Sequence, residues 1–161
     1  MLREAGLTVF AEVARRVIVR ERDRRPHVLP WNDRRHFDRL IIEEMIKDYQ
    51  AATCNSVNFF DRALPDLIGW ARFAGIEEGA YAPVVKEHPY EKSVFFLTPD
   101  AKTYVQNDDR PYSFEESMTI ATRLREGYVD FGYQIVEVDF DEPRRMAASI
   151  LRRAQDLVRA E

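Results

Sequence analysis

The stretch VNFFDRALPD, residues 57–66, decides the fold of this chain. Its apolar first half, VNFF, is typical of a short buried strand, and this strand runs directly into Asp61 and Arg62. Burying a charge costs free energy unless the charge is paired or used. The pattern therefore places Asp61 and Arg62 where a strand leaves the hydrophobic core, at a position that a ligand can reach.

Outward from this stretch, predicted strands alternate with predicted helices. This alternation is typical of an α/β domain with a mainly parallel sheet and flanking helices. A segment rich in Gly and Pro, residues 75–92, is interpreted as a loop or linker. The strands are predicted at 7–10, 57–60, 93–99 and 133–139, and the helices at 12–25, 37–49, 66–74, 114–128 and from 143 onward.

Polar residues follow each predicted strand. In parallel sheets, ligands bind at the carboxyl ends of the strands. The residues at these ends include Glu12, Asp61, Asp100 and Asp139. If the strands are parallel, these side chains share one edge, and the sequence predicts a ligand site there.

Composition and charge narrow the class of protein. The chain has 161 residues, which is enough for one domain with a real core. A net charge of −4 argues against a general nucleic-acid binder, and no apolar run is long enough to span a membrane. The lone Cys54 excludes an intrachain disulfide and fits a cytoplasmic protein. The three histidines are scattered, with no metal-ligand spacing.

Six segments, in this order, resemble the predicted P-loop ATPase and kinase family that includes the AAA domain of NadR-type ribosylnicotinamide kinases. The resemblance implies a nucleoside-kinase-like P-loop fold. It also implies binding of ATP with Mg²⁺, followed by hydrolysis or by phosphoryl transfer to a small-molecule phosphate acceptor. The segments are EVARRVI (12–18), LPWND (29–33), FFDRALPD (59–66), YEKSVFFLTP (90–99), YVQNDDRPYSFEE (104–116) and FGYQIVEV (131–138).

The resemblance implies catalytic roles for three residues. Asp61 resembles the acid that ends the Walker B strand and holds Mg²⁺ directly or through water. Arg62 resembles the arginine that follows this acid in related nucleotide kinases and engages the acceptor. Arg110 resembles the arginine of a lid around residues 100–125, which closes over the phosphates.

Three further residues resemble the acceptor side of the family's site. Glu12 and Arg15 correspond to an E-x-x-R pair, and Asp66 orients the loop or caps the helix that follows it. Simpler interpretations remain open. Asp61 and Arg62 can form a surface ion pair or a helix cap, and the other charges can be solvated. Some aromatic residues are interpreted as packing residues rather than a stacking surface: Trp31, Trp70, Tyr81 and Tyr90.

One departure from the family concerns the phosphate-binding loop. The 161 residues contain no G-x-x-x-x-G-K-[ST] motif, whose backbone N–H groups cradle phosphates. The opening MLREAGLTVF resembles the end of the helix that follows this loop. The family's central first strand is then missing between residues 57–60 and 93–99, and the domain is expected to be N-terminally incomplete. Either the strands close up, or another chain fills the gap, or the gene product is longer, which is the outcome expected here.

Smaller departures affect the lid and the base-binding region. Asn107 stands where the family has an acid, and Asp139 stands where it has proline. We expect these 161 residues to be catalytically inactive alone. The alternative is a non-catalytic binding module that a partner or a homo-oligomer completes. A third interpretation, a plain α/β domain with convergent motifs, would be favoured by antiparallel strands and a wide separation of Asp61, Glu12 and Arg110.

Overall fold

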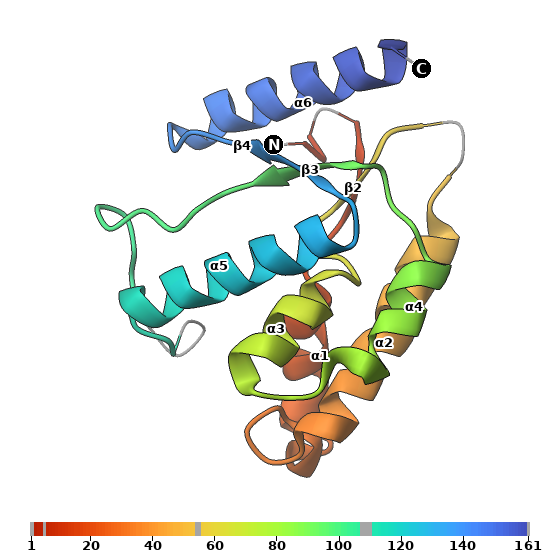
Figure 1. The fold of residues 1–161 in the computed structure, drawn as a ribbon, viewed down its shortest axis with the longest axis vertical. Helices are drawn as coiled ribbons and strands as arrows, with labels where there is room; N and C mark the ends of the chain where they lie inside the picture. Colours follow the sequence, from red (N-terminus) through yellow and green to blue (C-terminus); the bar gives the residue numbers. More distant parts are fainter. Residues whose placement is uncertain (1, 5, 54–55, 107–110, 161) are drawn as a thin grey trace. The chain divides into compact units, whose positions relative to one another are not determined.

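The computed structural model describes residues 2–4, 6–53, 56–106 and 111–160 (Figure 1). The chain divides into two compact units, Leu2–Leu64 and Pro65–Glu161. We describe each unit by itself.

The first unit holds a two-stranded parallel sheet and two long helices. Strand β1 (Thr8–Phe10) pairs with β2 (Asn58–Phe60), with Phe10 opposite Phe60. The rings of these two residues stack with their centroids 4.7 Å apart. Between the strands, the chain forms α1 (Val13–Arg22), the short 3-10 helix η1 (Pro26–Val28) and α2 (Arg34–Ala51).

The two long helices of this unit bury one apolar face each. Helix α1 buries Val13 and Val17, and α2 buries Phe37, Ile41 and Met45, as the helical spacing of these residues predicts. Asp33 caps α2, since its side chain accepts a hydrogen bond from the His36 N–H. Helix α2 therefore begins at Arg34, three residues before the predicted helix at 37–49.

Ion pairs join α1 to α2 on their polar sides. Arg16 pairs with Asp48, and Arg20 pairs with Glu44. Glu21 is buried, with hydrogen bonds from Arg25 and Arg20. These bonds lower the pKa of Glu21 to about 2, with the Arg25 bond as the largest cause.

The second unit contains the other parallel pair of strands. Strand β3 (Ser93–Phe96) pairs with β4 (Gln134–Glu137), and the pairing runs from Ser93 opposite Gln134 to Phe96 opposite Glu137. The helices of this unit are α3 (Asp66–Ala74), η2 (Glu78–Ala80), α4 (Ala82–Glu87), α5 (Phe114–Asp130) and α6 (Pro143–Ala160).

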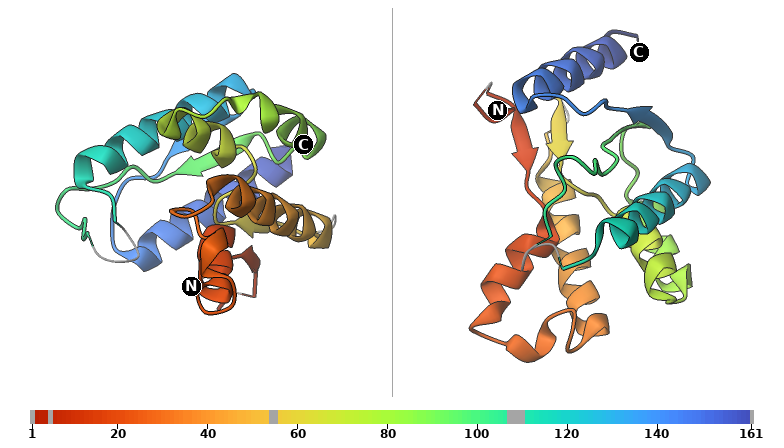
Figure 2. Two further views of the ribbon diagram at one scale, coloured as in Figure 1. Left: turned by 90° about the horizontal axis from the view of Figure 1, so that it is seen from below. Right: turned by 90° about the vertical axis from the view of Figure 1, so that its left-hand side faces the viewer.

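Helix α5 covers one face of the β3–β4 pair, and α3 packs beside α5 (Figure 1 and Figure 2). The core between them holds Phe96, Ile120 and Leu124, with Trp70 against it. Because side chains alternate along a strand, Phe95 lies on the opposite face from Phe96.

Two glycines let α3 and α5 approach closely. A Cβ atom at Gly69 would lie 2.5 Å from the Leu124 Cα, and one at Gly127 would lie 3.1 Å from the Gly69 nitrogen. Any side chain at Gly69 therefore collides with the α5 backbone.

The structure corrects two sequence predictions. Residues 75–92 are not only loop, because they contain η2 and α4. Helix α4 is six residues long, with proline in its first turn, so its apolar pattern is too short to recognise. The side chain of Trp31 is 64% exposed and is not a packing residue, since its neighbour Leu29 fills the core instead.

Both strand pairs of the described residues are parallel, so the antiparallel arrangement that would favour the third interpretation is not observed there. Within the described residues, the strands form two sheets of two strands each rather than one continuous sheet. In this part of the chain, β2 has β1 as its one strand neighbour, and β3 has β4.

Candidate functional site

The carboxyl edge of the β1–β2 pair carries two of the predicted site residues. The Asp61 N–H donates to the Phe10 carbonyl oxygen at 2.8 Å, so the parallel pairing continues one residue past β2. Asp61 itself is exposed, and Glu12 follows β1 by two residues. Of the four acids predicted to share one edge, Glu12 and Asp61 follow neighbouring parallel strands, whereas Asp100 and Asp139 follow the strands of a separate sheet.

Glu12 occupies the N-cap position of α1, yet its side chain makes no capping hydrogen bond. Arg15 lies three residues later on the same helix and is exposed. Among the described residues, no ion pair joins Glu12 and Arg15, although their spacing would allow one. Glu12 and Arg15 therefore both lie at the start of α1, and they form no ion pair with each other.

Arg62 has an unusual backbone conformation, which sequence reasoning missed. Its φ angle is 72°, and it is the one non-glycine residue with positive φ in the described part of the chain. This left-handed conformation costs a residue with a Cβ about 1–2 kcal/mol. Ala63 and Leu64, which follow, are buried and hold the backbone in place. Strain of this kind clusters at functional sites, where surrounding structure enforces it.

Asp66 lies in the second unit, as the first residue of α3, and only 3% of it is exposed. The Tyr128 hydroxyl on α5 donates to its Oδ2 at 2.5 Å. The Tyr128 ring in turn meets the Tyr133 ring edge to face, with centroids 5.6 Å apart. These contacts favour an anchoring role for Asp66 over direct contact with a substrate. A negative charge in the first turn also suits the helix dipole.

Arg110 and Asn107 lie outside the described residues. The predicted lid region, 100–125, includes the first turns of α5, which starts at Phe114 behind a capping box formed by Ser113 and Glu116. Tyr104 fastens the preceding loop to this helix, because its hydroxyl lies 2.5 Å from the Ser117 Oγ.

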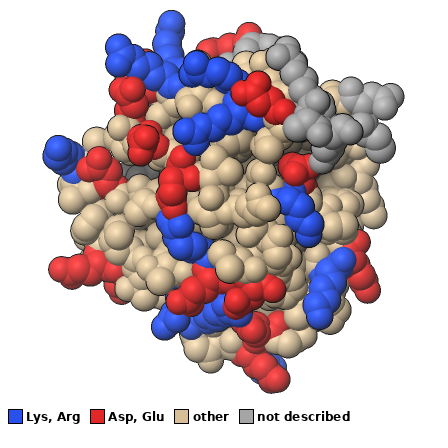
Figure 3. Space-filling model, turned by 45° about the horizontal axis from the view of Figure 1, so that its top comes forward, with Lys and Arg blue, Asp and Glu red and all other residues tan. Residues whose placement is uncertain are grey.

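The arrangement of acidic side chains decides how a metal ion could be held. On the face drawn in Figure 3, basic and acidic side chains are interspersed. The described residues contain no group of three or more His, Cys, Asp or Glu side chains that could enclose a metal ion. Mg²⁺ does not need such a cage, since one or two carboxylates with waters and substrate phosphates hold it. Asp61 and Glu12 fit this requirement, because both carboxylates lie at the edge that β1 and β2 share.

Among the described residues, no helix is both long enough and apolar enough to cross a membrane. Residues 1–145 match the model of the family described as AAA domain. No curated protein matches the chain, and no solved structure matches it.

Proposed function

The chain belongs to this AAA domain family, and from that membership we propose that it is an ATP-binding protein of the P-loop type, which hydrolyses Mg·ATP or transfers its terminal phosphoryl group to a small-molecule acceptor. Membership of this family suggests nucleotide binding, and the choice between hydrolysis and phosphoryl transfer is part of the proposal. The α/β fold with parallel strands is compatible with it.

The observation that carries the proposal is the position of Asp61. Its N–H extends the β1–β2 pairing, so its backbone is fixed at the carboxyl edge while its carboxylate is exposed. Parallel sheets bind ligands at this edge. The strained Arg62 follows directly, as expected of a residue whose orientation is enforced for function.

In the proposed site, each residue has a separate role. Asp61 would hold Mg²⁺, directly or through water, and Glu12 is the second carboxylate at this edge. Mg·ATP supplies the transferable phosphoryl group when bound. Arg62 and Arg15 would bind and orient an anionic or hydroxyl-bearing acceptor, since guanidinium groups suit oxygen-rich ligands. The family resemblance adds Arg110 as a phosphate-covering lid residue.

A second candidate, a non-catalytic binding module, is favoured by one observation. The 161 residues contain no G-x-x-x-x-G-K-[ST] motif, so they lack the backbone cradle that holds phosphates in P-loop proteins. We therefore expect these residues to bind nucleotide weakly by themselves. In the module, a partner or a second copy of the chain would complete the fold, because two-stranded sheets are marginal alone.

The test has a genetic arm and an enzymatic arm. An in-frame G-x-x-x-x-G-K-[ST] in the DNA upstream of Met1 would favour the enzyme, and a stop codon close upstream would favour the module. For a chain extended to such a motif, phosphate release from Mg·ATP should fall at least about 100-fold in Asp61→Asn, because a metal ligand is lost. The matched control is Asp23→Asn, which changes an exposed acid at the end of α1. Equal rates in both variants would refute the role of Asp61.

A further inference from the structure

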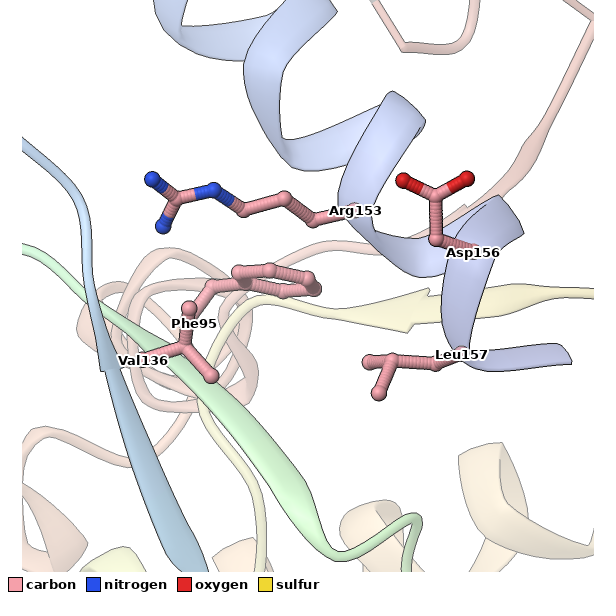
Figure 4. Close-up of a pocket in the computed structure, with 5 residues that line it drawn as sticks. All are labelled: Phe95, Val136, Arg153, Asp156 and Leu157. Carbon is pink, nitrogen blue, oxygen red and sulfur yellow. The ribbon is translucent and has the colours of Figure 1, made fainter. Parts of the chain in front are cut away.

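A pocket lies between the β3–β4 pair and helix α6, on the face of the sheet opposite α5 (Figure 4). It is a depression of about 360 Å³ that is largely open to solvent rather than an enclosed cavity. The lining is Phe95 from β3, Val136 from β4, and Arg153, Asp156 and Leu157 from α6. The three α6 residues lie beyond the family match, which ends at residue 145, whereas Phe95 and Val136 lie within it.

The sheet residues of the pocket form one apolar wall. Phe95 and Val136 lie directly opposite each other in the strand register, and both are half-buried. Leu157 points toward this wall from α6 (Figure 4). These three side chains leave apolar surface in contact with water, which an apolar ligand would cover favourably.

The charged residues of the pocket are one cation and one anion that do not neutralise each other. Arg153 and Asp156 are three residues apart on α6, a spacing that often forms an ion pair. Yet neither a hydrogen bond nor an ion pair joins these two described residues. Arg153 instead donates from Nη1 to the Glu137 carbonyl oxygen at 2.9 Å, which fixes its guanidinium and leaves other N–H groups available. In Figure 4 the two side chains leave α6 in different directions.

This arrangement discriminates between ligand classes. A ligand with only a negative charge would be attracted by Arg153 and repelled by Asp156. A ligand with only a positive charge would be attracted by Asp156 and repelled by Arg153. A ligand that carries both charges next to an apolar group satisfies all of the lining. We propose that the pocket binds a zwitterion with an apolar side chain, of the class of free apolar α-amino acids. The carboxylate lies on Arg153, the ammonium group on Asp156, and the side chain against Phe95, Val136 and Leu157.

The test uses L-phenylalanine and two analogues, each of which lacks one charge, against the 161-residue chain. Binding is followed by nuclear magnetic resonance, through shifts of the Val136 and Leu157 amide signals. Since the charges at the mouth are exposed to water, we expect a dissociation constant on the order of 1 mM. The analogue without the ammonium group, 3-phenylpropionate, and the analogue without the carboxylate, phenethylamine, should each bind about tenfold more weakly or worse.

Three substitutions assign the site. Arg153→Gln and Asp156→Asn should each weaken L-phenylalanine binding about tenfold, because each removes one charge-assisted contact. Asp156→Asn keeps the Arg153 bond to Glu137, so it separates ligand binding from the attachment of α6. The matched control is Arg152→Gln, an exposed neighbour that does not line the pocket, and it should leave binding unchanged.

Several results would overturn the proposal. They are no shift of the pocket signals at 20 mM ligand, about equal binding of 3-phenylpropionate and L-phenylalanine, or an equal effect of the Arg152 and Arg153 substitutions. None of these measurements involves a nucleotide, so their outcome is separate from that of the ATP experiments.

Discussion

Replacement of Arg62 tests whether the loop after β2 is held under strain. In the left-handed conformation that this residue adopts, with φ at 72°, a Cβ atom costs about 1–2 kcal/mol. Glycine escapes that cost but loses about 0.5–1 kcal/mol of backbone entropy on folding. Arg62→Gly should therefore be more stable than Arg62→Ala by up to about 1.5 kcal/mol. Arg62→Asn should fall between the two, because asparagine tolerates this conformation better than alanine.

The comparison between the glycine and alanine variants isolates the backbone. Both substitutions remove the arginine side chain beyond Cβ together with its contacts, so those losses cancel in the difference and the Cβ atom remains as what distinguishes the variants. The assay is urea unfolding followed by circular dichroism, with the midpoint and slope giving the free energy of unfolding. An alanine variant as stable as the glycine variant, or more stable, would refute the strain. In an active extended chain, both variants should lose acceptor turnover equally, because the proposed function assigns acceptor binding to the guanidinium that both variants lack.

Three further predictions concern stability. Gly69→Ala should destabilise the protein by about 1–3 kcal/mol in urea unfolding, because the added Cβ atom would collide with the α5 backbone. The control is Gly79→Ala, whose added Cβ atom would have its nearest contact at 3.6 Å and should change stability by less than about 0.5 kcal/mol. Tyr128→Phe removes the hydrogen bond to Asp66 and should cost about 1–3 kcal/mol, and an unchanged midpoint would contradict the anchoring role. The pKa of Glu21 is lowered to about 2, so the unfolded chain takes up this proton first and stability falls as pH drops from 4.5 toward 2. Melting temperatures between pH 2 and 6 should show this loss in the wild type and a smaller loss in Glu21→Gln.

Much of the local structure follows from the sequence, because strand and helix periods are local signals. The runs around Phe59 and Phe95 form strands where the pattern predicts them. The strands are shorter than predicted: β3 ends at Phe96 rather than at residue 99, and β4 spans Gln134–Glu137 rather than 133–139. Helix α4 escaped prediction because six residues carry too little periodicity.

The site is less predictable than the elements. The edge position of Asp61 follows from a strand that ends on an acid, and parallel pairing confirms it. The positive φ of Arg62 has no sequence signal, because arginine does not favour that conformation. The partner of Asp66 lies 62 residues away in the chain, so only the packing of α3 on α5 identifies it.

The central claim, that the Asp61 edge belongs to a nucleotide site, is tested most directly by calorimetric titration with Mg·ATP. The titration compares the 161-residue chain with a chain extended upstream to any in-frame phosphate-binding loop. We predict weak or undetectable binding by the first and clear binding by the second, lost in Asp61→Ala. Absence of binding by both chains, or binding that Asp61→Ala leaves unchanged, would contradict the claim.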